Sequence, residues 1–346
     1  MKPVHGGDLA QATRNFGIPK EDWLDLSTGI NPRPWPVPAV PARVWSRLPW
    51  LEEELLAAAR DYYGCTSVTA VPGTQGAIQA LPSFFPARGR VAIPHTGYRE
   101  HLRAWQAAGH GIRMYRDEEL DALAEDPEIR VLLLINPNNP GCQLLPPERI
   151  QGWLKVLRGR GAVLVIDEAF MDVLPQYSIA RPVQEDSLII LRSIGKFFGL
   201  AGLRLGFVIA DPARCAVLRD KLGPWAVNGP AQWLGARALA DRAWQQEARD
   251  WLQSQAVLLR DCLAKVFSGA NATIRHTPLF VTVTLPVPVA ESWSQHMGRC
   301  GILIRLIEGD GDSAILRFGL PADAGQLLHL QSALARYPGS APGASR

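Results

Sequence analysis

The sequence lacks the features that mark disulfide-rich, zinc-binding and membrane-spanning proteins. Its 346 residues include only 5 cysteines, scattered and without a C-x-x-C pair, which argues against both a disulfide framework and a metal site. The longest purely aliphatic runs, Val131 to Ile135 and Ala162 to Ile166, are far shorter than the roughly 20 residues that cross a bilayer. We therefore expect free thiols, no metal and no membrane span.

The chain also lacks an excess of charge and an apolar N-terminal stretch. Its 36 basic and 33 acidic residues leave a net charge of +3, too even a mixture to indicate a nucleic-acid partner. Residues 1 to 8 have no apolar run of the kind that a secretory signal needs, so a cytoplasmic location is expected. With 47% hydrophobic residues, a chain of this length is expected to form two globular domains.

A proline-rich segment precedes the first long helix. Residues 31 to 50 contain six prolines, which argue against a helix or a central strand because proline lacks an N–H and fixes φ. We expect an extended arm there. Apolar residues at helical spacing then predict a helix over Leu51 to Tyr63, with Gly64 where the helix would end.

Up to about residue 210, short aliphatic or β-branched runs alternate with amphipathic stretches. Buried runs without polar alternation, separated by helical segments, predict an α/β fold with a mainly parallel sheet covered on both faces. The expected strands are Val68 to Val71, Arg90 to Pro94, Val131 to Ile135, Ala162 to Ile166, Ser187 to Leu191 and Leu205 to Ala210.

The C-terminal third has the mixed pattern of a smaller α+β domain. A long helix is expected over Gln232 to Phe267, and a hairpin turn at Gly309 to Gly311. Further strands are expected at Leu279 to Leu285, Gly301 to Ile307 and Ala314 to Gly319. The chain is thus expected to divide into residues 1–50, an arm that joins the small domain, residues 51–230, a large domain, and residues 231–346, a small domain.

Parallel sheets bind ligands beyond the carboxyl ends of their strands, so the segments that follow the strands are where a site is expected. The first runs from Val71 to Gly76, where a Thr hydroxyl and free N–H groups at a helix start fit a phosphate, although a plain strand-to-helix turn fits as well. The second, Asn136 to Gly141, has two prolines and a glycine and is by itself only a rigid turn.

The third and fourth segments carry charged groups. Asp167 ends a strand that should be buried, where a carboxylate is costly unless it is paired with a protonated ring nitrogen or with a structural cation. Lys196 has an apolar neighbourhood, which suits an amine that forms imines at neutral pH. Ser193 and Arg204 flank it at distances that allow a hydroxyl and a guanidinium to reach one phosphate.

In this order and spacing the four segments resemble the fold-type I family of enzymes that use pyridoxal 5'-phosphate (PLP), the aspartate aminotransferase superfamily. The match runs from about Gly73 to Gly206. Within that superfamily the chain is similar to the threonine-phosphate decarboxylases of cobalamin biosynthesis and to histidinol-phosphate aminotransferases. Residues 5–8 (His-Gly-Gly-Asp), 26–32 and 167–170 (Asp-Glu-Ala-Phe) look like the decarboxylase group.

The resemblance assigns a role to each matching residue. It implies that Lys196 forms the Schiff base and that Asp167 pairs with the pyridine nitrogen. Asn139 would bond the ring oxygen, and Tyr98 would stack on the ring. The residues that would hold the cofactor phosphate are Gly73, Thr74, Gln75, Ser193 and Arg204. Arg317 would bind the carboxylate of the substrate, and His5, Asn31 and Arg305 would make further contacts with the substrate.

Three positions depart from the aminotransferase pattern. Phe170 stands where aminotransferases usually have a tyrosine that bonds the ring oxygen, which favours the decarboxylase branch. Leu48-Pro49-Trp50 replaces a Tyr-Pro pair that often reaches the phosphate in the partner subunit. The segment around Tyr98 is longer than usual.

The resemblance implies a PLP-dependent lyase that decarboxylates L-threonine O-3-phosphate to (R)-1-amino-2-propanol O-2-phosphate. It also implies that the large domain binds PLP, that the arm joins the small domain, and that the protein is a homodimer. The alternative is transamination of histidinol phosphate or a similar amino acid. A catalytically silent PLP-binding scaffold is a third hypothesis, against which the intact set of Lys196, Asp167 and Arg204 argues.

Overall fold

The computed structural model describes residues 6–86, 89–180, 186–268 and 271–338. By contacts between Cα atoms the chain splits into two compact units. The large unit contains residues 34–139 and 143–246, and the small unit contains residues 1–33, 140–142 and 247–346. The boundaries at residues 50 and 230, drawn from the sequence as limits of functional domains, stay a prediction.

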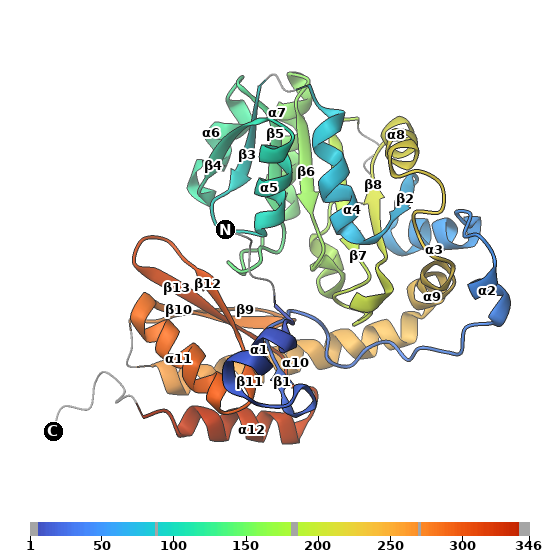
Figure 1. Cartoon of the computed structure of the whole chain (residues 1–346). Coiled ribbons are helices and arrows are strands. Elements are labelled where there is room, and N and C mark those ends of the chain that lie inside the picture. Colours follow the sequence, from blue (N-terminus) through green and yellow to red (C-terminus); the bar gives the residue numbers. More distant parts are fainter. Residues whose placement is uncertain (1–5, 87–88, 181–185, 269–270, 339–346) are drawn as a thin grey trace. The chain divides into compact units, whose positions relative to one another are not determined.

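The large unit is built on a seven-stranded sheet, coloured from light blue to yellow-green in Figure 1. Its strands in spatial order are β2 (Val68–Val71), β8 (Gly206–Ile209), β7 (Leu188–Ser193), β6 (Val163–Asp167), β5 (Ile129–Ile135), β3 (Arg90–Pro94) and β4 (Gly111–Tyr115). Only β8 runs antiparallel to its neighbours. The expected α/β class with a mainly parallel sheet is confirmed.

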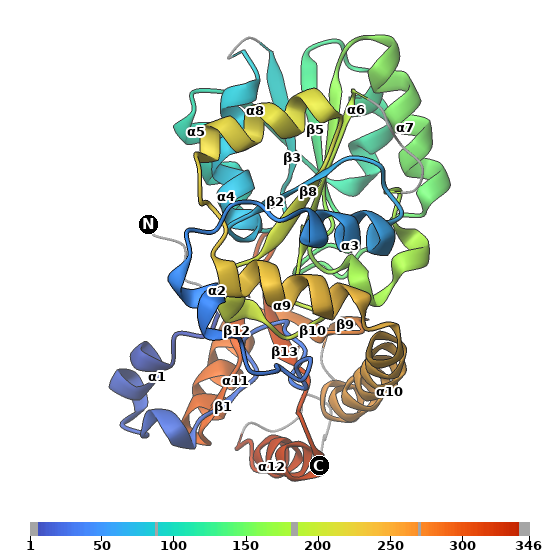
Figure 2. The same cartoon turned by 90° about the vertical axis from the view of Figure 1, so that its right-hand side faces the viewer.

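Helices cover both faces of this sheet (Figure 2). Helices α4 (Gly73–Ala80), α5 (Arg99–Ala107) and α8 (Pro212–Leu222) lie on one face, and α6 (Leu120–Glu125) and α7 (Pro147–Gly159) lie on the other. Every residue of β2, β6, β7 and β8 is buried. Burial on both faces explains why these strands are nearly continuous apolar runs.

The proline-rich segment is less uniform than its sequence suggests. Although most of residues 34–50 is irregular, a short helix, α2 (Ala42–Ser46), interrupts it, so the expectation that this segment contains no helix is wrong. Pro41 directly precedes α2, where the missing N–H would have no partner within the helix anyway. Helix α3 (Glu53–Tyr63) follows and ends at Gly64 with φ of 67°, as predicted.

The long helix that was expected over residues 232–267 is two helices. Helix α9 (Gly229–Ala240) ends at Asp241, and α10 (Arg242–Phe267) begins after it. The Asp241 carboxylate accepts hydrogen bonds from the Trp244 backbone N–H and from the Trp35 indole N–H. An aspartate that accepts from a backbone N–H three residues later is a helix N-cap, so it marks a new helix.

The small unit contains a four-stranded antiparallel sheet in the order β12 (Arg305–Glu308), β13 (Ser313–Gly319), β10 (Phe280–Pro286) and β9 (Thr273–Thr277). Helix α11 (Val287–Arg299) packs on this sheet, and α12 (Ala324–Ala335) follows β13. The hairpin between β12 and β13 closes with Gly309 N donating to Ser313 O at 3.0 Å, as predicted.

The single strand expected over residues 301–307 is two short strands. Strand β11 (Ile302–Leu303) pairs in parallel with β1 (Leu24–Asp25), and β12 pairs with β13. Helix α1 (Leu9–Phe16) and most of α10 also belong to this unit. Among the described residues the cysteines are free, and none of the helices described is long and apolar enough to cross a membrane.

Candidate active site

A cavity of about 170 Å³ lies in the large unit, at the carboxyl ends of the parallel strands. All the residues predicted to hold the cofactor line it: Gly73, Thr74, Gln75, Tyr98, Asn139, Asp167, Ser193, Lys196 and Arg204. Residues separated by more than 130 positions in sequence thus meet at one edge of the sheet, which is where parallel sheets bind ligands.

One side of the cavity is suited to an anion. Helix α4 begins at Gly73, whose φ is +66°, and a Cβ there would lie 2.5 Å from Nη2 of Arg204. A Cβ at Gly206 would lie 2.7 Å from the backbone N of Thr74. The two glycines therefore allow a guanidinium and a neighbouring strand to approach the start of α4, where backbone N–H groups favour negative charge.

Asp167 is held from two sides at the end of β6. Its Oδ2 is 2.8 Å from Nε2 of His101, and its Oδ1 accepts from the backbone N–H of Ala169 at 3.0 Å. Both Asp167 and His101 are buried, with exposed fractions of 5% and 1%. The carboxylate is thus fixed in one orientation, as a partner for a ring nitrogen must be.

Lys196 lies in the loop after β7, and its amine faces the ring of Phe170. Its Nζ is 5.4 Å from the centre of the Phe170 ring. The Ser193 hydroxyl accepts from the backbone N–H of Gly195 at 3.2 Å, and the carbonyl of Lys196 accepts from Gly199 at 3.2 Å. These bonds fold the loop tightly, so that the half-buried amine reaches the cavity.

A short chain of hydrogen bonds fixes the side of the cavity formed by Tyr98. The Tyr98 hydroxyl donates to Oε1 of Gln75 at 3.2 Å, and Nε2 of Gln75 donates to Oε2 of the buried Glu100 at 3.0 Å. Burial raises the pKa of Tyr98 to about 12, and Glu100 and Asp167 add to the effect. The phenol therefore stays neutral and acts as a donor. Stacking of Tyr98 on a cofactor ring stays a prediction.

Asn139 is presented by the rigid loop after β5. The backbone N of Asn138 donates to Gln143 O at 2.7 Å, and its side chain donates to Thr96 O at 2.9 Å. The side chain of Asn136 exchanges hydrogen bonds with the backbone of Leu145. The loop's own amides are thus used to hold its shape, and Asn139 lines the cavity.

The predicted substrate residues that the structure describes lie in the small unit. Arg305 and Arg317 are directly opposite each other on β12 and β13. Arg317 is 8% exposed, and its Nη2 donates to Ser27 O at 2.5 Å. Burial, followed by the charge of Arg305, lowers the pKa of Arg317 to about 10. Asn31 is buried and accepts from the backbone N of Arg33 at 2.9 Å, whereas His5 lies outside the described residues.

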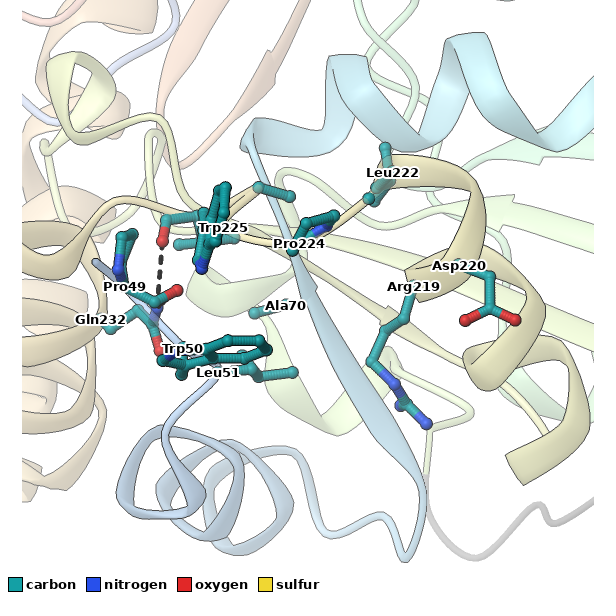
Figure 3. A pocket seen from close by; sticks show the side chains of 13 residues that line it. Pro49, Trp50, Leu51, Ala70, Arg219, Asp220, Leu222, Pro224, Trp225 and Gln232 are labelled. Atoms are coloured by element: carbon teal, nitrogen blue, oxygen red, sulfur yellow. Dashed lines mark hydrogen bonds between the residues drawn. The ribbon is translucent and has the colours of Figure 1, made fainter.

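A second cavity in the large unit contains none of the predicted site residues (Figure 3). It has a volume of about 360 Å³ and a mainly apolar lining, with Arg219 and Asp220 at one side. Trp50 and Trp225 line it in an edge-to-face arrangement, with ring centroids 6.1 Å apart. Of these two cavities, the first is the one lined by the amine of Lys196 and the fixed carboxylate of Asp167.

Reasoning from the sequence missed His101. The residue lies on α5, 66 positions before Asp167, and a histidine on an amphipathic helix has no local pattern that signals a partner. Its place three residues after Tyr98 was the available signal, because Tyr98 is the N-cap residue of α5 and the two rings are in contact, with centroids 6.3 Å apart.

The donors around the first cavity fit PLP. Arg204, the hydroxyls of Thr74 and Ser193, and the start of α4 suit its phosphate, and the fixed carboxylate of Asp167 suits its ring nitrogen. The amine of Lys196, which lines the same cavity, suits its aldehyde. All these groups come from the same compact unit.

Comparison with known proteins agrees with this fit. A family model described as "Aminotransferase class I and II" matches residues 48–329. A threonine-phosphate decarboxylase from Pseudomonas aeruginosa is 40% identical over 95% of this chain and 96% of its own, and one from Sinorhizobium sp. is 41% identical over 96% of this chain and 98% of its own.

The fold has a solved counterpart in a histidinol-phosphate aminotransferase from Sinorhizobium meliloti, in complex with pyridoxal-5'-phosphate. The TM-score is 0.75 at 20% identity, over 96% of this chain and 94% of the other. The resemblance stated from the sequence is confirmed. The chain therefore belongs to the aminotransferase class I and II family of pyridoxal 5'-phosphate-dependent enzymes.

Proposed function

We propose that this chain decarboxylates L-threonine O-3-phosphate to (R)-1-amino-2-propanol O-2-phosphate, as a PLP-dependent lyase of cobalamin biosynthesis. The observation that carries the proposal is its similarity, over nearly the whole length of both chains, to two proteins named threonine-phosphate decarboxylase. The geometry of the first cavity supports it, since the residues that a PLP enzyme needs line one space.

Each cofactor residue predicted from the sequence has a proposed task. Lys196 would hold the cofactor aldehyde, and Arg204, Ser193, Thr74 and Gln75 would hold the phosphate. Gly73 leaves the space in which the Arg204 guanidinium lies. Asn139 would donate to the ring oxygen, and Tyr98 would pack on the ring.

When bound, PLP accepts the electron pair that remains at the substrate α-carbon after a bond to that carbon breaks. Asp167 would keep a proton on the ring nitrogen, because an ionised carboxylate beside that atom favours its charged form. His101 fixes the orientation of Asp167 through the 2.8 Å contact. Lys196 Nζ would deliver the proton that replaces carbon dioxide at the α-carbon.

The choice between decarboxylation and transamination depends on which α-carbon bond is held perpendicular to the ring plane. Residues that bind the substrate carboxylate set this geometry, and Arg317 is the residue predicted to do so, with His5, Asn31 and Arg305 as further predicted contacts. Phe170 supports the lyase proposal, because a phenyl ring beside Lys196 supplies no hydroxyl to the cofactor.

We also propose a cytoplasmic homodimer, in which residues 1–50 form an arm joined to the small domain, residues 51–230 bind PLP and residues 231–346 form the small domain. Exposed apolar side chains near the second cavity support a protein partner for this surface: Trp45, Leu48, Trp50 and Trp225 are 67%, 63%, 66% and 46% exposed. Large exposed apolar patches are typical of interaction sites.

Two parallel assays test the proposed reaction. Purified protein loaded with PLP is incubated with L-threonine O-3-phosphate while released carbon dioxide is measured, and a second sample receives histidinol phosphate with 2-oxoglutarate while glutamate is measured. We expect carbon dioxide from the first assay, abolished in Lys196→Ala, and no glutamate from the second.

The result that contradicts the proposal is glutamate formation without carbon dioxide, which favours the aminotransferase alternative. Protein that stays colourless with PLP, and carries no chromophore that borohydride reduces onto Lys196, favours the silent scaffold instead.

A further inference from the structure

A buried group of charged residues lies beside the proposed cofactor site but outside its cavity. The Arg192 guanidinium donates through Nη1 to Oε2 of Glu168 at 2.6 Å and through Nη2 to Oδ1 of Asp172. The Ser178 hydroxyl donates to the same Glu168 oxygen at 2.6 Å, and the ring of Tyr63 lies 4.6 Å from the guanidinium carbon. These five residues are called the Arg192 cluster.

The Arg192 cluster lies at the carboxyl ends of the two strands that carry the cofactor residues. Glu168 directly follows Asp167 at the end of β6, and Arg192 directly precedes Ser193 at the end of β7. Because successive side chains of a strand point to opposite faces, Asp167 and Ser193 line the cavity while Glu168 and Arg192 point away from it. The ion pair therefore ties the two strand ends together from behind.

The Arg192 cluster also holds the loop that closes one side of the cavity. Asp172 lies in the short turn Met171–Val173, and Ser178 lies a few residues further on. The segment between Asp167 and Asp172 carries Ala169 and Phe170, both of which line the cavity. Bonds from one guanidinium to the residues that bracket Phe170 fix where its ring lies against Lys196.

The burial of the charges argues for a role in geometry rather than in stability. Glu168 and Asp172 are 0% exposed and Arg192 is 2% exposed. Burial raises the pKa of the Glu168 carboxyl, against the opposing effect of Arg192. An apolar group of equal size is often as stable as a buried ion cluster, because desolvation of the charges offsets their attraction. What the charges add is a fixed set of directions and distances.

We propose that Arg192, Glu168 and Asp172 are positioning residues for the cofactor: together they fix the spacing between Asp167, Ser193 and Lys196 to which PLP binds. The inference rests on the proposed use of this cavity for PLP. It assigns a task to three residues that touch neither cofactor nor substrate.

The test compares three sets of variants at a temperature at which all are folded. Arg192→Lys and Glu168→Gln loosen the cluster while they keep most of its volume. The triple variant Arg192→Met, Glu168→Met, Asp172→Leu replaces the charges by apolar groups. The matched control is Arg160→Met, because Arg160 binds the Ala124 and Ile129 carbonyls at 3.0 and 2.6 Å near the other ends of β5 and β6.

PLP affinity, the visible circular dichroism of bound PLP, and kcat are measured beside thermal unfolding. We expect Arg192→Lys and Glu168→Gln to bind PLP about tenfold more weakly, with altered dichroism. The triple variant is expected to remain folded while kcat falls about 100-fold, since small displacements of a reacting group have effects of that size. Arg160→Met is expected to change thermal unfolding but neither affinity nor dichroism.

The inference is overturned if folded Glu168→Gln and Arg192→Lys keep the wild-type affinity and dichroism, whether or not the triple variant folds. Borohydride reduction of the wild type separates this outcome from failure of the proposed function. If borohydride attaches PLP to Lys196 of the wild type while the variants keep their PLP affinity and dichroism, only the positioning role is overturned. If no PLP is attached to Lys196, the proposed function is overturned and the inference with it.

Discussion

Two arginines that are expected to bind anions lie in contrasting surroundings. Arg204 of the large unit is exposed, has a left-handed backbone with φ of 56°, and lies against Gly73 at the start of α4. Arg317 of the small unit is in the middle of strand β13, 8% exposed, with Arg305 on the neighbouring strand. One guanidinium is at the rim of a site and the other is part of a core.

The two surroundings imply different effects of the two arginines on the stability of the fold. An exposed guanidinium stays hydrated, so Arg204 can be kept or lost with little effect on stability. Burial and the charge of Arg305 lower the pKa of Arg317 more than Asp25 raises it, which means that the folded chain disfavours this charge. A charge kept at such a cost points to a function that needs it, and in the proposed reaction that function is to bind the substrate carboxylate.

The largest expected effect tests the large unit alone. Lys196→Ala removes the amine that holds the cofactor, so we expect decarboxylation to fall by about 10³-fold or more. Carbon dioxide release measures it, and Lys155→Ala on an exposed position of α7 is the control. A Lys196→Ala protein that turns over at the native rate would remove the basis of the proposal.

The next largest effect is expected from the loss of the Arg317 guanidinium. Arg317→Met is expected to lower kcat/KM by about 100-fold, because it leaves the substrate anion unpaired, and to leave PLP affinity unchanged. Its free energy of unfolding in urea is expected to change by no more than about 1 kcal/mol, because removal of a disfavoured buried charge offsets the loss of the hydrogen bond to Ser27 O.

Arg204→Met is the opposite case and the control. We expect it to weaken PLP binding, measured by dialysis, without a gain in stability. If Arg317→Met unfolds far more easily than the wild type, Arg317 is a structural residue and the contrast with Arg204 fails.

The buried strands and the residues of the cavity could be predicted from the sequence because their signals are local. The runs over β2, β3 and β5 are aliphatic or β-branched because they are buried, and the motif residues directly follow them. Exposed edge strands gave no such signal, whereas β2, also at an edge of its sheet, is fully buried. Strand β4 has exposed and half-buried residues at four of its five positions, and β9 has the polar sequence Thr-Ile-Arg-His-Thr, so neither was predicted.

Contacts between distant segments were equally out of reach. Asp241, which separates α9 from α10, also accepts from the indole of Trp35, 206 positions away. The division of residues 301–307 depends on β1, which pairs with β11. No spacing in the sequence encodes partners that only the folded chain brings together.

A smaller effect tests the contact that the sequence did not reveal. His101→Asn removes the 2.8 Å contact to Asp167, so the carboxylate loses one of its two supports and we expect kcat to fall about tenfold. His110→Asn is the matched control, because His110 is also buried but binds the carbonyl of Pro82 at 2.8 Å. Equal kcat for the two variants would mean that His101 has no role in holding Asp167.

The smallest effect concerns the ring beside Lys196. Phe170→Tyr adds a hydroxyl where aminotransferases usually have one, so we expect PLP to bind a few-fold more tightly, in keeping with one added hydrogen bond of about 1 kcal/mol. Equilibrium dialysis measures the affinity, and Phe85→Tyr, in a partly buried ring of the large unit outside the cavity, is the control. Formation of the ketone product of transamination, the 2-oxo acid of L-threonine O-3-phosphate, is measured in the same samples with 2-oxoglutarate as the amino-group acceptor. If Phe170→Tyr binds PLP no more tightly than Phe85→Tyr and forms no more ketone than the wild type, the phenyl ring is not what favours the lyase reaction, and the choice of reaction lies with the substrate-binding arginines.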